Sequence, residues 1–326
     1  MLDRRNFKIK RFTLSSPTDC LVCGESCNQA EVLTAPMLRA AYEAYFRSAC
    51  PESAIPCDFI LVSCVQCKLE FCLEPRVSKD FYPWVVELPC YYPEHRLEWN
   101  LVLEELATIG RKVAILEVGC GSGVFLNKIA DLPNVTAAGI DLTESAIQQC
   151  KKQSLNAIVS DLRNYIESPP ANLPKKFDFI VGSHVLEHVN NPVEMLRDCF
   201  NLLHPEGSVL MSLPLSPNDH ESAMFDPILY PPHHLTRWHR ATFLALGKTL
   251  SANVTVSSIK QRSAFRALSH TMFCALNYRN SKASIVGRFN LFLKKPFYWT
   301  SQFYWQVLRR SNDSLVSDHV LLKLTK

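Results

Sequence analysis

Apolar and polar positions in the middle of the chain follow two different periods in turn. Short apolar runs predict buried strands, and apolar residues three or four positions apart predict helices. The expected strands are residues 113–118, 135–140, 157–160, 177–182, 208–213 and 254–259. The expected helices are residues 95–109, 144–153, 193–203 and 242–250, with a further helix starting over 124–130. Strands that alternate with helices predict an α/β fold with a mainly parallel sheet and helices on both faces.

Two other zones flank this alternating region. The first is rich in cysteine and has short apolar runs, of which 59–63 and 69–72 read as the two strands of a hairpin. The second ends in a last strand-like run, 319–324. We therefore expect four parts: a Cys-rich module and linker at 1–94, an α/β domain at 95–260, an insertion at 261–312 and a final strand within 313–326.

Composition narrows the class of protein. The chain has 326 residues, of which 47% are apolar and 20% charged, as in ordinary globular proteins. No uncharged apolar run approaches the ~20 residues of a transmembrane helix. The basic start, 1–12, is not followed by the apolar stretch of a secretory signal. These features predict a folded cytoplasmic protein.

The 13 cysteines are concentrated in the N-terminal zone, where two C-x-x-C pairs stand 40 residues apart. Two such pairs can complete a tetrahedral four-thiolate site, in which zinc would be structural because no position is left for water. The expected zinc ligands are Cys20, Cys23, Cys64 and Cys67. A redox pair or buried unpaired thiols are the alternatives. Lys68 stands where a glycine usually follows the second pair, so this turn departs from the common pattern.

A strand, a glycine turn and the start of a helix follow one another at 115–123, which reads Ile-Leu-Glu-Val-Gly-Cys-Gly-Ser-Gly. Glycine permits left-handed backbone and close approach of a ligand, and the helix start offers unpaired N–H groups. The dinucleotide-binding pattern does not fit, because the third glycine is Gly123 and residue 124 is Val.

The pattern from Glu117 to Gly123 instead resembles motif I of the class I S-adenosylmethionine (SAM)-dependent methyltransferases. Further similar segments follow in order: 139–142 (Gly-Ile-Asp-Leu), 160–162 (Ser-Asp-Leu), 183–189 (Ser-His-Val-Leu-Glu-His-Val), 203–208 (Leu-His-Pro-Glu-Gly-Ser) and 317–322 (Ser-Asp-His-Val-Leu-Leu). The resemblance implies a Rossmann-like, seven-stranded methyltransferase sheet. With its cysteine pairs, the chain also resembles bacterial methyltransferases of sugars and natural products that carry an N-terminal zinc-ribbon module.

The resemblance also implies which residues bind SAM. Asp141 would bind the ribose hydroxyls, and Asp161 would lie near the adenine amine. The expected SAM-binding residues are Glu117, Gly119, Cys120, Gly121, Gly123, Asp141, Leu142, Asp161, Leu162, Ser183 and His184.

Methyl transfer to a hydroxyl requires an oriented acceptor and a base. In this fold the acceptor lies beyond the fourth and fifth strands, where segment 230–238 (Tyr-Pro-Pro-His-His-Leu-Thr-Arg-Trp) is expected. Histidine titrates near neutral pH, so we expect His234, or else His233, to be the catalytic base. The alternative is that one histidine only bonds a backbone carbonyl and orders the loop. Arg237 would hold an anionic substrate or lie at the surface.

Charge is unevenly distributed, although the net charge is only +4. Residues 227–312 contain no Asp or Glu but thirteen Lys and Arg, and aromatic residues are interleaved with the basic ones over 261–312. This pattern favours a helical cap or lid. It also suits peripheral contact with a membrane surface or a lipid-linked substrate. Nucleic acid is the less favoured partner.

These observations together predict a SAM-dependent methyltransferase acting on a small molecule or glycan, most readily at oxygen. A nucleotide-linked or lipid-linked sugar is the substrate class that the resemblance implies. The alternatives are an RNA or protein methyltransferase, which the absence of an Asn-Pro-Pro-Tyr-type motif at 183–186 disfavours, and a non-catalytic scaffold with this fold. The sequence does not specify the oligomeric state.

Overall fold

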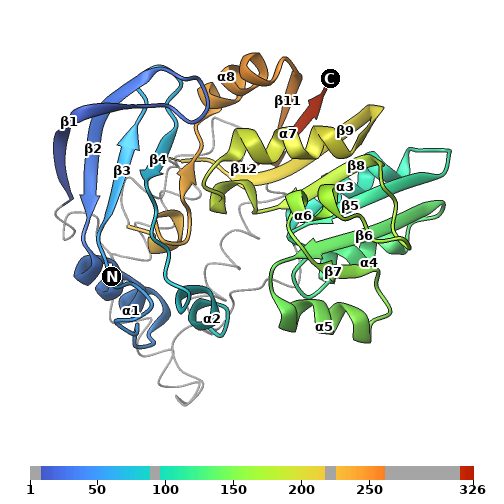
Figure 1. Cartoon of the computed structure of the whole chain (residues 1–326), viewed down its shortest axis with the longest axis horizontal. Coiled ribbons are helices and arrows are strands. Elements are labelled where there is room, and N and C mark those ends of the chain that lie inside the picture. The colour runs from blue at the N-terminus through green and yellow to red at the C-terminus, as the bar shows by residue number, and fades with distance from the viewer. Residues whose placement is uncertain (1–8, 89–95, 217–224, 261–315) are drawn as a thin grey trace. The chain divides into compact units, whose positions relative to one another are not determined.

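The computed structural model describes residues 9–88, 96–216, 225–260 and 316–326. The expected insertion at 261–312 lies outside these ranges. One compact unit, Met1–Ser257 with Asp318–Lys326, holds the body of two sheets (Figure 1). A second unit, Ser258–Ser317, contributes only its two ends to the described residues. None of the described helices is long and apolar enough to cross a membrane.

The smaller sheet is antiparallel and has the strand order β1-β2-β3-β4-β10. Its strands are β1 (Lys10–Asp19), β2 (Ser26–Leu33), β3 (Phe59–Ser63), β4 (Glu70–Leu73) and β10 (Thr236–Arg237). Two helices accompany it, α1 (Ala35–Phe46) and α2 (Phe81–Val85). The β3–β4 hairpin confirms the hairpin expected at 59–72. The edge strand β10 was not expected here, because it follows the strands of the larger sheet up to β9 and is far from β4 in the sequence.

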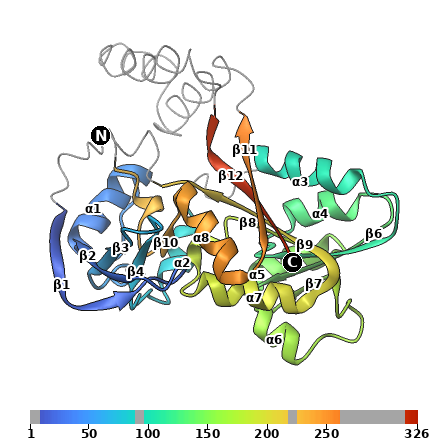
Figure 2. The same ribbon diagram turned by 90° about the horizontal axis from the view of Figure 1, so that it is seen from above.

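The larger sheet has the strand order β11-β12-β9-β8-β5-β6-β7. Its strands are β5 (Val113–Val118), β6 (Val135–Asp141), β7 (Ala157–Val159), β8 (Phe177–Ser183), β9 (Leu203–Pro214), β11 (Asn253–Lys260) and β12 (Val316–Thr325). The strands from β7 to β9 run parallel, and β12 pairs antiparallel with β9. Figure 2 shows β11 and β12 side by side at the opposite edge from β7.

Helices cover both faces of this sheet, as predicted. They are α3 (Leu97–Ala107), α4 (Val124–Ala130), α5 (Glu144–Lys152), α6 (Leu162–Glu167), α7 (Pro192–Leu202) and α8 (Arg240–Leu250), with single 3₁₀ turns η2 (Leu186–His188) and η3 (Pro227–Leu229). Side chains alternate along the central strand β5: Val113 and Ile115 pack with α3, α4 and α5, whereas Leu116 and Val118 pack with α6, α7 and α8. This is the seven-stranded Rossmann-like sheet that the sequence predicts.

The Cys-rich module shares its core with the larger sheet's helices. Cys20, Val22 and Cys67 belong to the same buried cluster as α7 and α8. Two hydroxyls of α8 bond to the module: Thr242 donates to the Cys67 carbonyl at 2.9 Å, and Thr249 donates to the Val22 carbonyl at 2.7 Å. The cysteine pairs are therefore fixed against the helix that follows the histidine loop.

Candidate functional site

The turn between β5 and α4 requires its glycines. Gly119, Gly121 and Gly123 have φ angles of 69°, 50° and 85°, in the left-handed region that favours glycine. Space is also limiting, because a Cβ on Gly119 would lie 2.5 Å from Val185 Cγ2. A Cβ on Gly123 would lie 2.6 Å from Leu155 Cδ1. The glycines thus let the backbone turn sharply between the strand and the first N–H groups of α4.

Asp141, at the end of β6, holds this turn in place. Its Oδ2 accepts a hydrogen bond from the Gly121 N–H at 2.9 Å, and its Oδ1 accepts one from the Thr143 N–H at 2.8 Å. The next residue, Leu142, is 74% exposed although it is apolar. A carboxylate beside an exposed apolar side chain offers hydrogen bonds to hydroxyls and a flat contact for an aromatic base.

Glu117 is the most unusual polar residue of this region. It is buried at the end of β5, and its Oε2 has no hydrogen-bond partner among the residues the structure describes. Burial, together with the charge of Asp141, raises the pKa of Glu117 to about 8. A buried acceptor without a donor is costly, so it indicates a missing donor such as a cationic group of a ligand.

The third acidic position has a clear structural role. Asp161 is the N-cap of α6, and its Oδ1 accepts a hydrogen bond from the Asn164 N–H at 2.7 Å. Leu162 beside it is buried in the core. Cys120, in the glycine turn, is also buried, and a Cβ on Gly139 would lie 2.9 Å from its Sγ.

The carboxyl end of β8 brings a histidine between two buried carboxylates. His184 has a φ of 55°, and its Nε2 lies 2.8 Å from Glu98 Oε1 while its Nδ1 lies 3.0 Å from Glu187 Oε1. The preceding residue, Ser183, accepts a hydrogen bond from Trp99 Nε1 at 3.0 Å. Burial lowers the pKa of His184, but the two carboxylates outweigh it and raise this pKa overall. Burial opposes ionisation of Glu98, yet His184 brings the pKa of Glu98 down to about 2.

Three other histidines form a cluster close to His184 and Glu187. The rings of His188, His233 and His234 are stacked or perpendicular to one another, with centroids 4.6 to 4.9 Å apart. One ring nitrogen from each lies within 4.8 Å of the others. Burial lowers the pKa of His188, and it lowers the pKa values of His233 and His234 well below the ordinary value. The imidazoles are therefore neutral at pH 7.

The histidine loop is held by the Cys-rich module's sheet. β10 pairs with β4 through Thr236 opposite Phe71, and the Leu235 N–H donates to the Glu187 carbonyl at 2.8 Å. Arg237 is buried and ion-pairs with Glu70, so it neither lies at the surface nor offers a bare charge to an anion. Sequence reasoning missed this pairing, since a two-residue strand carries no period.

Each predicted histidine has a defined neighbour in this arrangement. His233 Nδ1 bonds the Ile228 carbonyl at 2.9 Å, which is the loop-ordering contact that the sequence left open. His234 Nε2 lies 3.9 Å from Glu187 Oε1, beyond hydrogen-bond distance. Sequence reasoning did not anticipate His188 as a member of this cluster.

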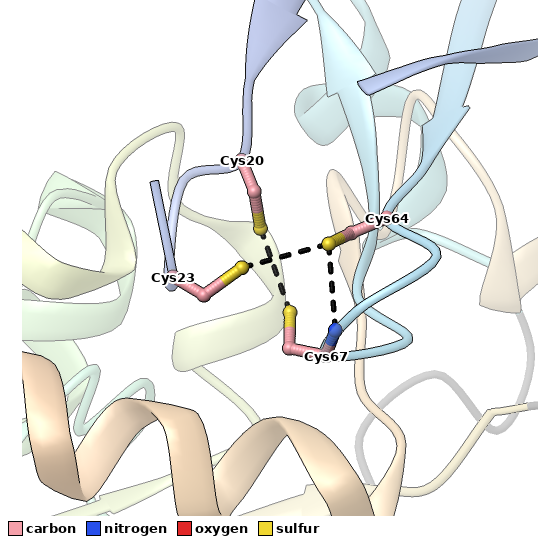
Figure 3. A group of neighbouring side chains, drawn as sticks. All are labelled: Cys20, Cys23, Cys64 and Cys67. Carbon is pink, nitrogen blue, oxygen red and sulfur yellow. Dashed lines mark hydrogen bonds between the residues drawn. The ribbon is translucent and has the colours of Figure 1, made fainter. Parts of the chain in front are cut away.

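The four predicted metal ligands form a compact cluster (Figure 3). Cys20 Sγ lies 3.5 Å from Cys67 Sγ, and Cys23 Sγ lies 3.5 Å from Cys64 Sγ. Bonds of ~2.3 Å to one tetrahedral ion would place the sulfurs ~3.8 Å apart, so the cluster fits zinc.

The two cysteine turns have the same backbone. The Gly24 N–H donates to the Cys20 carbonyl at 3.0 Å, and the Lys68 N–H donates to the Cys64 carbonyl at 3.0 Å. Gly24 and Lys68 both have left-handed φ angles, 75° and 66°. The lysine therefore adopts the backbone that glycine usually supplies, at the cost of local strain.

Comparisons with known proteins agree with this geometry. A family model described as a methyltransferase domain matches residues 91–250. Ubiquinone biosynthesis O-methyltransferase from Pseudomonas putida (strain W619) is 32% identical over 118 residues, which are 36% of this chain and 50% of that protein. The protein of the same name from Albidiferax ferrireducens is 32% identical over 120 residues, which are 36% of this chain and 46% of that protein. The chain spans about half the length of the curated relatives it matches.

A solved structure shares the fold. A SAM dependent methyltransferase from Archaeoglobus fulgidus matches with a TM-score of 0.50 and 16% identity, covering 75% of this chain and all of that one. The sheet order and the glycine turn define a Rossmann-like α/β protein. Residues 91–250 thus match a methyltransferase domain, and the described part of the chain has the class I methyltransferase fold together with a zinc-ribbon-like module that holds a four-cysteine cluster.

Proposed function

We propose that this chain transfers a methyl group from SAM to an oxygen atom of a small molecule or glycan. One observation carries the proposal: the glycine turn is tied to Asp141 and lies next to Glu117, whose buried carboxyl group has an oxygen, Oε2, that lacks a donor among the described residues. The ammonium group of SAM would supply that donor. The names of the curated relatives favour oxygen as the acceptor atom.

The residues at the carboxyl ends of β5, β6, β7 and β8 would divide the work of binding SAM. The glycine turn, with Glu117 and Cys120, would face the methionine part. Asp141 and Leu142 would take the ribose and one face of the adenine. Asp161 and Leu162 would border the adenine. Ser183 and His184 would line the site on the side of β8.

The four cysteines would hold a structural zinc ion. Four thiolates leave no open coordination position, so this ion would not touch substrate. Its role would be to fix the turns that α8 contacts through Thr242 and Thr249. Because β10 extends the module's sheet, the zinc ion would also stabilise the position of the histidine loop.

The histidine cluster would activate the acceptor. It follows β8 and lies beside Glu187, at the edge of the sheet where the acceptor is expected. Neutral imidazoles can accept a proton, and we assign this task to His234 with His233 as its neighbour. A contribution of 261–312 to a lid or to binding a lipid-linked sugar lies outside the described residues.

The first test is calorimetric titration with S-adenosylhomocysteine. We expect micromolar binding by the wild type and loss of binding in Asp141→Ala. Asp131→Ala is the matched control, since Asp131 is an exposed acid that ends α4. Equal binding by Asp141→Ala and the wild type would refute the assigned ribose site. No binding by folded wild-type protein would favour a scaffold that has lost activity.

A further inference from the structure

The histidine cluster, His188, His233 and His234, also has the features of a metal-binding site. It is separate from the four cysteines and is built by two segments, η2 and the loop before β10. One ring nitrogen of each histidine lies within 4.8 Å of those of the other two, and the four cysteine sulfurs also lie within 4.8 Å of one another. Nitrogens bound to one tetrahedral ion lie ~3.4 Å apart, so small side-chain rotations would bring them to one ion.

Backbone carbonyls fix the protonation of two of these rings. His188 Nδ1 lies 2.6 Å from the His233 carbonyl, and His233 Nδ1 lies 2.9 Å from the Ile228 carbonyl. A carbonyl oxygen only accepts, so each Nδ1 carries the hydrogen and each Nε2 carries a lone pair. Metal-binding histidines are commonly oriented in this way, because the bond from one nitrogen sets the tautomer of the other.

Glu187 places a buried negative charge between His184 and the histidine cluster. It is fully buried, and neither of its oxygens makes a well-aligned hydrogen bond within the ranges that the structure describes. Its Oε1 lies 3.0 Å from His184 Nδ1 and 3.9 Å from His234 Nε2. This carboxylate would attract a divalent cation to the histidines, and Glu187 would orient the His234 ring.

We propose that His188, His233 and His234 bind one divalent transition-metal ion of the zinc type, separate from the ion at the cysteines. Imidazole favours such ions, whereas magnesium and calcium prefer oxygen ligands. Three protein ligands leave a position open. If the proposed function is correct, that position takes the acceptor oxygen. His234 is then a ligand of the ion and no longer the base, so the hydroxyl proton passes to solvent water as the oxygen bonds to the methyl carbon and the carbon–sulfur bond breaks.

Metal stoichiometry tests the site without measuring activity. Tag-free protein loaded with zinc and then gel-filtered should hold about two ions per chain, one at each cluster. The double variant His188→Ala/His234→Ala should hold about one. His204→Ala is the matched control, because His204 is exposed and lies outside the cluster, and it should hold as much zinc as the wild type.

Spectroscopy of the wild type avoids any dependence on the folding of a variant. Zinc X-ray absorption should show imidazole nitrogen together with sulfur. The cobalt-loaded protein should lose its nitrogen-type visible bands in the double variant and keep the sulfur-to-cobalt bands. About one ion per chain with sulfur ligands alone would overturn the proposal.

The two proposals fail in different ways. Protein that binds two ions but no S-adenosylhomocysteine would refute methyl transfer and leave the metal site standing. Protein that binds S-adenosylhomocysteine but only one, sulfur-bound ion would support methyl transfer and refute the histidine site.

Discussion

Replacing Glu117 with glutamine should make the ligand-free protein more stable at alkaline pH. The carboxyl group is buried, with a pKa of about 8 in the folded protein against an ordinary value of 4.5. The unfolded chain therefore releases this proton near pH 4.5, whereas the folded protein keeps it up to about pH 8. Because the folded pKa is the higher one, this group's contribution to stability is complete below pH 4.5 and is lost as the pH rises.

The magnitude follows from the size of the shift. Each pH unit between these two pKa values lowers the free energy of unfolding by about 1.4 kcal/mol, so the loss reaches about 5 kcal/mol above pH 8. A glutamine side chain at this position would have no proton to lose and about the same volume. The variant and the wild type should therefore be about equally stable at pH 4.5 and differ by up to about 5 kcal/mol at pH 8.

Urea unfolding of ligand-free protein, followed at several pH values, measures this difference. Comparison of the two proteins cancels the other titrating groups that they share. A difference in unfolding free energy that stays the same from pH 5 to pH 8 would refute the raised pKa of the buried Glu117 carboxyl group.

The same residue predicts a proton release on ligand binding. The ammonium group of S-adenosylhomocysteine next to Glu117 would lower its pKa, so binding at pH 7 should release up to about one proton. Calorimetry in buffers of different ionisation enthalpy measures this number. Glu117→Gln should bind more weakly and release none, and equal release by both proteins would contradict our placement of the ligand.

Three further substitutions test the zinc module and the histidine loop. Thr242→Val leaves the buried Cys67 carbonyl, in the second cysteine turn, without its donor, so the free energy of unfolding in urea should fall by about 1–3 kcal/mol. Thr108→Val, at an exposed hydroxyl, is the control and should change this free energy little. Lys68→Gly should relieve the strain of a left-handed lysine and stabilise the zinc-loaded protein by about 1 kcal/mol in thermal unfolding. Lys79→Gly is the control, and a loss of stability in Lys68→Gly as large as in this control would contradict the prediction. His234→Ala should keep the affinity for S-adenosylhomocysteine and lower turnover about 100-fold or more. Unchanged turnover would refute the role of His234 in activating the acceptor.

Much of the larger sheet could be predicted because its signals are local. The residues of β5 and β3 were predicted with their observed bounds, and α4 was predicted to start where it does, since each is an apolar run or a helical face bounded by glycine or polar residues. The glycine turn was equally clear, because its spacing and its neighbouring strand are contiguous. The strands of the cysteine hairpin followed from the turn that the second C-x-x-C pair imposes.

Other elements carried no such signal. β1 is exposed along most of its length, so it shows no alternation of buried and exposed positions. α6 has six residues, too few for a helical period to emerge, and depends on its Asp161 cap. β10 has two residues and exists because β4 offers an unpaired edge.

The sequence by itself determined the alternation of strands and helices in the α/β region, the glycine turn with Glu117 and Asp141, and the two cysteine pairs, because each is encoded by neighbouring residues. Only the tertiary structure decided the surroundings of the histidines. His188 meets His233 and His234 across 45 residues of chain, because β10 adds to a sheet made by the first 73 residues. Burial in that contact then lowers the pKa values of the histidines, and burial at the end of β5 raises the pKa of Glu117. Such shifts arise from desolvation, which depends on packing between distant segments and not on local sequence.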